Sequence, residues 1–174
     1  MFQRIKATRE KKQAQALLES ADGWHAVCVQ VIEICGQVLH DETVQQGDIG
    51  ISLDKADRLL FQLRNQASEA GRLLRSLAPA LAPRLNLTTN RVFELRNDTA
   101  RFLIRCQGPD PTAAGGQLDG VARRVYYDRA MQEVGIKARR LHTEVERDLH
   151  ATWDDLQGWI AEARIRERAD SITK

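Results

Sequence analysis

The feature that most constrains the fold is a set of apolar residues that recur alternately three and four positions apart along residues 21–81. The first stripe comprises Ala21, Trp24, Cys28, Val31, Cys35 and Val38. The second comprises Leu53, Ala56, Leu60, Leu63, Ala67, Ala70, Leu74, Leu77 and Leu81. This spacing keeps side chains on one side of an α-helix and seats them against neighbouring helices. The pattern therefore predicts a fold in which helices pack on helices.

Breaks in the pattern divide the chain into four predicted helices. They span about 2–40, 52–77, 88–106 and 118–168. Ser52 is expected to cap the second helix, and Thr88 or Thr89 the third, while Pro79 and Pro83 end the second helix. Short connections favour antiparallel neighbours. The predicted fold class is all-α: an antiparallel four-helix bundle with long first and fourth helices.

The length of 174 residues suits a single helical-bundle domain, residues 1–174. Because the first and fourth helices exceed the other two in length, residues 1–14 and about 155–170 are expected to project as a two-helix extension. Gly135 is expected to weaken or bend the fourth helix. An extension of this kind usually packs against another protein surface, often that of a second copy of the chain. The partner prediction is therefore another protein or self-association as a homodimer.

Composition narrows the classes of protein to consider. Hydrophobic residues make up 43% and charged residues 29%, which is typical of globular chains. A net charge of +2 gives no strong field for nucleic acid or membranes. No stretch approaches the ~20 apolar residues of a membrane span, so we expect a cytoplasmic protein without membrane insertion. Cys28 and Cys35 lie about 10 Å apart along one helix, too far for a disulfide.

Arg96 is the candidate site residue that the helical pattern singles out. It falls near the middle of the apolar side of the segment 88–106. The opposite side is expected to be solvated and to carry Arg91, Glu94, Asp98, Arg101 and Arg105. Because a buried guanidinium needs a partner, we expect Arg96 to bond Asp128 or the Tyr127 hydroxyl, level with small residues at 67–71. Two interpretations stay open: a polar contact that fixes the register of the bundle, or a contact to a ligand, RNA or partner protein.

The residues around Arg96 carry a resemblance to a known family. Leu95-Arg96-Asn97 followed by Ala100 resembles the signature of the HEPN superfamily, helical-bundle proteins that include many toxin and defence ribonucleases. The family motif is Arg, four to six residues, then His. In that family the Arg orients the scissile phosphate and the His does acid–base work.

The chain departs from the family pattern at the histidine. Arg101 stands where the family would place it, and no other Arg in the sequence has a His at that spacing. The resemblance therefore implies a degenerate, non-catalytic relative that binds RNA or antagonises a partner. Arg96, Asn97, Arg101 and Arg105 are then the candidate binding residues.

Histidines suggest a further alternative, a bundle metalloprotein. His142, Glu146 and His150 recur every four residues on one helical strip, and His25 and Cys28 are three apart. Di-metal bundles usually carry inward Glu-x-x-His pairs, and this sequence contains none. We therefore expect a solvated flank, with no metal or cofactor.

Searches for catalytic motifs find no Gly-rich phosphate loop, Cys-x-x-Cys, His-Glu-x-x-His or Ser nucleophile elbow. No catalytic residue is predicted. The leading hypothesis is a non-catalytic adaptor, assembly or regulatory protein acting through helix–helix contacts. A degenerate HEPN-like RNA-binding or toxin- and defence-associated protein is the first alternative, and a bundle metalloprotein is the second.

Overall fold

Helices account for nearly all of the structure. The computed structural model describes the backbone of residues 2–40, 49–107 and 120–172, and the side chains of 12–40, 53–107 and 121–164 except 123. Within these ranges every residue is helical apart from the turn at 78–81, and no strand occurs. The all-α prediction is confirmed.

The elements follow one another along the chain as long rods. They are α1 (Phe2–His40), α2 (Ile49–Leu77), α3 (Ala82–Gln107), α4 (Gly120–Ala130), the π-helical turn η2 (Met131–Gly135) and α5 (Ile136–Ile172). α4, η2 and α5 follow one another without a break where the sequence predicted a single fourth helix. The π-turn ends at Gly135, where a Cβ would lie 2.5 Å from the Met131 sulfur and 3.0 Å from Phe102. A side chain at position 135 would therefore require the Met131 side chain and the Phe102 ring to shift.

Two predicted helix starts are wrong. α3 begins at Ala82, well before Thr88 and Thr89, which are buried inside it rather than capping it. Pro83 lies in the first turn of α3, where a missing backbone N–H costs nothing, instead of ending α2. α2 begins at Ile49, so Ser52 lies within its first turn and is not the cap.

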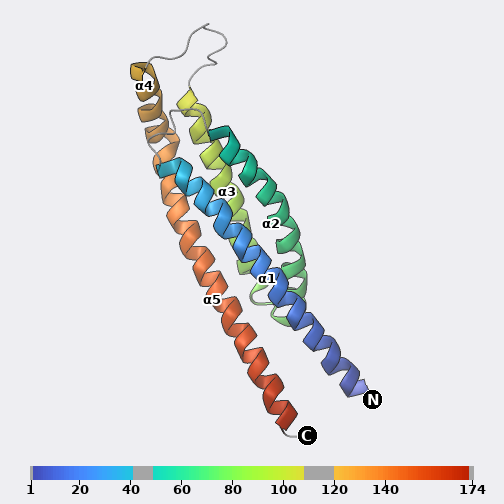
Figure 1. Ribbon diagram of the computed structural model, residues 1–174. Coiled ribbons are helices and arrows are strands. Elements are labelled where there is room, and N and C mark those ends of the chain that lie inside the picture. Colours follow the sequence, from blue (N-terminus) through green and yellow to red (C-terminus); the bar gives the residue numbers. More distant parts are fainter. Residues whose placement is uncertain (1, 41–48, 108–119, 173–174) are drawn as a thin grey trace.

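α1 and α3 occupy the middle of the arrangement. α1 packs against α2, α3 and α5, and α3 packs against α1, α2, α4 and α5. Contacts along α1 and α5 run in opposite order, since His25 stacks on Trp153 whereas the Leu39 carbonyl accepts from Arg139. Figure 1 shows the chain passing up and down in this way, with the start of α1 and the end of α5 at the same end.

The two long helices continue past the turn between α2 and α3. Figure 1 shows the blue end of α1 and the red end of α5 extending beyond this turn and diverging from each other. Buried side chains of α5 reach Leu156 and Ile160. The packed part of α5 therefore extends beyond residue 155, where the projecting segment was expected to begin.

Trp24 lies at the centre of the packing and is fully buried. Its indole Nε1 donates to the Thr89 hydroxyl at 2.9 Å, and that hydroxyl donates to the Leu85 carbonyl at 2.7 Å. Thr89 thus gives α3 a polar anchor for α1. The other large, fully buried side chains are Phe102, Leu17, Leu39, Leu63, Leu74, Leu85, Leu95, Leu149, Leu156, Val31 and Val92.

Replacing Thr89 by valine keeps the shape of the side chain but removes the acceptor for Trp24. The buried indole N–H is then unpaired, so we expect Thr89→Val to lower the free energy of unfolding by about 1–3 kcal/mol. Urea unfolding followed by circular dichroism measures the change. Thr143→Val is the control, because Thr143 is exposed and bonds only its own helix. Equal losses for the two variants would contradict the anchoring role.

Candidate functional site

Arg96 faces α2, and its partner is different from the one predicted. Its Nη2 lies 2.6 Å from Asp57 Oδ2, and the side chain of Arg96 is 22% exposed while that of Asp57 is 49% exposed. The Nε of Arg96 is buried without a hydrogen-bond partner. The guanidinium is thus partly enclosed between helices, but its charge is balanced by a carboxylate that reaches solvent.

The predicted partners of Arg96 lie on the fourth helix, whereas Arg96 faces α2. Its level along α2 also differs from the prediction. Because α3 begins at Ala82 after a short turn, each of its residues lies opposite an earlier residue of α2 than predicted. Asn86 lies beside Gly71, and Phe93 lies under the guanidinium of Arg64. Arg96 is accordingly level with Asp57 rather than with residues 67–71.

The other predicted binding residues do not gather around Arg96. Tyr127 packs edge-on against Phe102, with ring centroids 5.9 Å apart, and Asp128 is exposed on α4. Arg105 is exposed and its Nη1 lies 3.3 Å from a Glu133 carboxylate oxygen. Neither Tyr127 nor Asp128 makes the predicted contact with Arg96.

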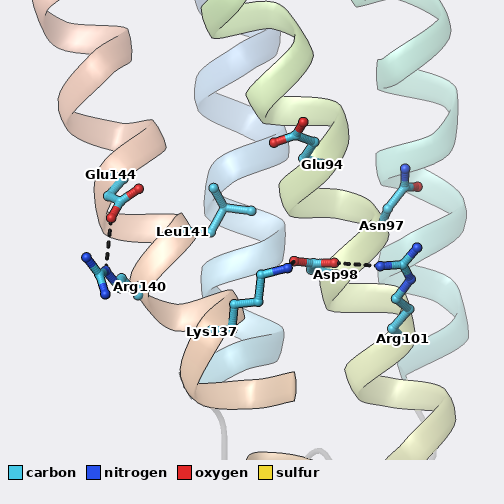
Figure 2. A pocket seen from close by; sticks show the side chains of 8 residues that line it. All are labelled: Glu94, Asn97, Asp98, Arg101, Lys137, Arg140, Leu141 and Glu144. Carbon is cyan, nitrogen blue, oxygen red and sulfur yellow. Dashed lines mark hydrogen bonds and ion pairs between the residues drawn. The ribbon is translucent and has the colours of Figure 1, made fainter. Parts of the chain in front are cut away.

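Asn97 and Arg101 line a separate surface, which we name the α3–α5 groove (Figure 2). It encloses about 630 Å³. Its lining residues are Glu94, Asn97, Asp98, Arg101, Lys137, Arg140, Leu141 and Glu144. The groove therefore contains three acids and three bases, with both kinds on each helix.

Asp98 forms the floor of this groove and was missed by the sequence analysis, which placed it on the solvated side. Its side chain is 9% exposed and bonds Arg101 Nη1 at 3.2 Å and Lys137 Nζ at 3.4 Å. Asp98 lies three residues after Leu95 and four before Phe102, so the apolar spacing itself could have indicated its burial. It joins α3 to α5 as an ion-paired carboxylate.

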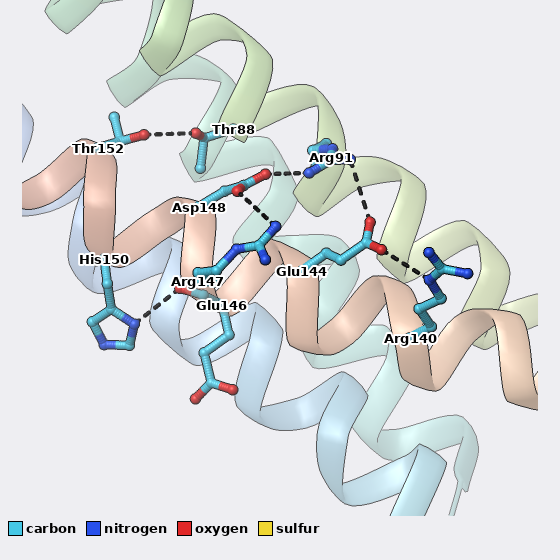
Figure 3. Close-up of polar contacts among 9 residues, drawn as sticks. All are labelled: Thr88, Arg91, Arg140, Glu144, Glu146, Arg147, Asp148, His150 and Thr152. Carbon is cyan, nitrogen blue, oxygen red and sulfur yellow. Dashed lines mark hydrogen bonds and ion pairs between the residues drawn. The ribbon is translucent and has the colours of Figure 1, made fainter.

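Ion pairs and hydrogen bonds continue along the whole α3–α5 contact (Figure 3). Thr88 and Thr152 hydroxyls lie 2.9 Å apart, and Arg91 bonds both Asp148 and Glu144. Further along, Arg84 pairs with Asp155. Every cation on α3 that contacts α5 thus has a carboxylate beside it. Binding of a phosphate there would first have to break an ion pair.

The residues of the alternative metal-site interpretation do not converge. The His142 ring lies 3.2 Å from the Ile32 carbonyl on α1, and His150 bonds the Glu146 carbonyl of its own helix. Figure 3 shows the His150 ring bonded to the Glu146 backbone and not to the Glu146 carboxylate. Among the described residues no group of three His, Cys, Asp or Glu is placed to hold a metal ion.

The buried cysteines stay protonated. Burial raises the pKa of Cys35 to about 11, and it raises the pKa of Cys28 still further above its ordinary value. A thiol rather than a thiolate is therefore present at neutral pH, and a thiol is a poor nucleophile and metal ligand. Both cysteines serve as small core side chains.

All four histidines of the sequence lie along the contact between α1 and α5. His25 stacks on Trp153 with centroids 4.3 Å apart, and His40 meets His142 edge-on at 5.7 Å. Burial, and then the neighbouring His150, lowers the pKa of His25 below its ordinary value. Burial lowers the pKa of His40 too, with Arg139 and His142 adding to the effect.

Comparisons with known proteins do not place the chain in a family. No protein-family model, curated protein or solved structure matches it. In the part of the chain that the structure describes, none of the helices has the length and apolar content to cross a membrane. The function must therefore be argued from the geometry.

The Arg96–Asp57 pair is expected to contribute modestly to stability because Asp57 is half exposed. Arg96→Ala should lower the free energy of unfolding by about 1 kcal/mol, through the lost pair and the lost packing of the arginine stem. A double-mutant cycle with Asp57→Ala should give a coupling energy below about 1 kcal/mol. A coupling of several kcal/mol would contradict this description, since it would require a fully desolvated pair.

Acidification should weaken the α1–α5 contact through His25 and His40. Their pKa values are lower in the folded chain than in the unfolded one, so between these values the unfolded state binds more protons. Stability is therefore complete above the unfolded value of about 6.5 and falls as the pH drops below it. At pH about 5.5 we expect the urea midpoint of the double variant His25→Asn/His40→Asn to be higher than that of the unmodified chain. An equal increase in the urea midpoint at pH about 8.5, where neither histidine is charged, would contradict the mechanism.

Proposed function

We propose that the chain is a non-catalytic adaptor, assembly or regulatory protein. In this proposal it is an antiparallel four-helix bundle that acts through helix–helix contacts with a partner protein or a second copy of itself. The observation that carries the proposal is the length of α1 and α5, which continue beyond the α2–α3 turn (Figure 1). In this proposal the ends of α1 and α5 beyond that turn are where another helix packs.

Exposed apolar side chains at the opposite end of the bundle support the same proposal. Val121 and Val125 on α4 are 75% and 60% exposed, and they lie four residues apart on one strip of the helix. Ile104, near the end of α3, is 65% exposed. Single exposed apolar residues are common, but a strip of them is a surface that helix packing would bury.

The RNA-binding alternative receives less support from the arrangement of charges. Arg96, Arg101 and Arg105 each lie beside a carboxylate, from Asp57, Asp98 and Glu133 respectively. Phosphate binding would have to separate these pairs, and each separation subtracts from the affinity. The metalloprotein alternative likewise receives no support, because His142, Glu146 and His150 do not form a metal-binding group in the described part of the chain.

Multi-angle light scattering of the full chain over a wide range of concentration tests the proposal. We expect a species heavier than one chain, or a protein that co-purifies with it from the native lysate. Val125→Glu should reduce this association by introducing a charge into the exposed strip, whereas Gln132→Glu, at an exposed polar position of η2, should leave it unchanged. A strictly monomeric chain with no co-purifying protein would count against the proposal.

A further inference from the structure

A second groove, between α2 and α3, has an unbalanced charge. We name it the α2–α3 groove, and it encloses about 310 Å³. Its lining residues are Arg64, Ala67, Ser68, Arg75, Asn86, Thr89, Asn90 and Phe93. Two guanidinium groups, two amides and two hydroxyls are among them, and no carboxylate is. The α3–α5 groove, by contrast, has acids and bases in equal number.

Arg64 and Arg75 make no ion pair with any residue in the described ranges. The arginines of α3, by contrast, each lie beside a carboxylate; they are Arg84, Arg91, Arg96, Arg101 and Arg105. The Arg64 guanidinium lies over the Phe93 ring, 5.6 Å from its centroid, which holds the charge at the wall of the groove. An uncompensated pair of cations in a polar groove favours an anionic occupant.

The two arginines start from well-separated points of α2, and Arg75 Nη1 reaches back to 3.8 Å from where a Cβ of Gly71 would lie. They are separated by 11 residues of α2, which is three turns and about 16.5 Å along the axis. Gly71 lies between them without a side chain, and a Cβ there would be 3.6 Å from the Asn86 Oδ1 of the opposite wall. The groove is therefore long and shallow, and it suits an elongated occupant with acidic groups at two points.

An α-helix satisfies this requirement more directly than a nucleic acid does. An α-helix returns to the same face after 11 residues, so two carboxylates at that spacing would reach both arginines. Single-stranded nucleic acid binds by stacking bases on open aromatic rings, and the ring that lines this groove, Phe93, is already covered by Arg64. We propose that an acidic helix of a partner protein lies along the α2–α3 groove, with carboxylates three turns apart on Arg64 and Arg75. The inference rests on the proposed function in taking a protein as the partner.

Fluorescence anisotropy with the full chain tests this inference. The probe is a labelled helical peptide with glutamates eleven residues apart, and the same peptide with lysines at those positions is the control. We expect saturable binding of the acidic peptide only, weakening with salt. Arg64→Gln and Arg75→Gln should each reduce the affinity about five-fold, which corresponds to one exposed ion pair. Arg58→Gln is the matched control, because Arg58 is exposed on α2 but does not line the groove.

Three results would overturn the inference. The first is no binding of the acidic peptide at low salt, and the second is an equal loss with Arg58→Gln. The third is tighter binding of a labelled single-stranded RNA that is lost with Arg64→Gln, which would assign the groove to nucleic acid. If the peptide fails to bind but light scattering finds an assembly, only the inference about this groove is wrong. A monomeric chain that binds the peptide would instead contradict self-association and support the groove.

Discussion

The burial of α1 against three other helices is the constraint on which the rest of the structure depends. Its side chains are fully buried at Trp24 near its middle, at Val31, and at Leu39 near its end. Each large apolar side chain removed from water contributes about 1.5–3 kcal/mol. Because α1 packs against α2, α3 and α5, its position decides where each of them lies. The long apolar stripe on one helix thereby organises the whole bundle.

Some of the charged side chains around this core form ion pairs within the chain, and others do not. Along the α3–α5 contact Arg91 of α3 meets Asp148, and Lys137 of α5 meets Asp98, so these groups join two helices of one chain. Along the α2–α3 groove Arg64 and Arg75 have no such partners. The first arrangement is what an internal contact requires, because an unpaired charge is costly where water is excluded. The second is what a surface for an acidic partner requires.

Periodicity alone could predict the all-helical fold because a spacing of three and four residues has one simple structural meaning. It could not predict the start of α3, since Pro83 is compatible both with the end of one helix and with the first turn of the next. That ambiguity changed the register of α3 on α2. The partner of Arg96 was missed because Arg96 faces α2 and not the fourth helix. The Arg96–Asp57 pair joins residues 39 apart in sequence, and their meeting depends on the length of the turn between α2 and α3. Asp98 was missed for a different reason, since a carboxylate in an apolar spacing was assigned to solvent.

Native-state hydrogen exchange measures the organising role of α1 most directly. If α1 is the central helix, its amides between Trp24 and Leu39 should exchange among the slowest in the chain, at the rate set by global unfolding. The amides of α4, which has exposed valines and packs mainly on the end of α3 and on η2, should exchange much faster. Exchange in the centre of α1 as fast as that in α4 would contradict a bundle built around this helix.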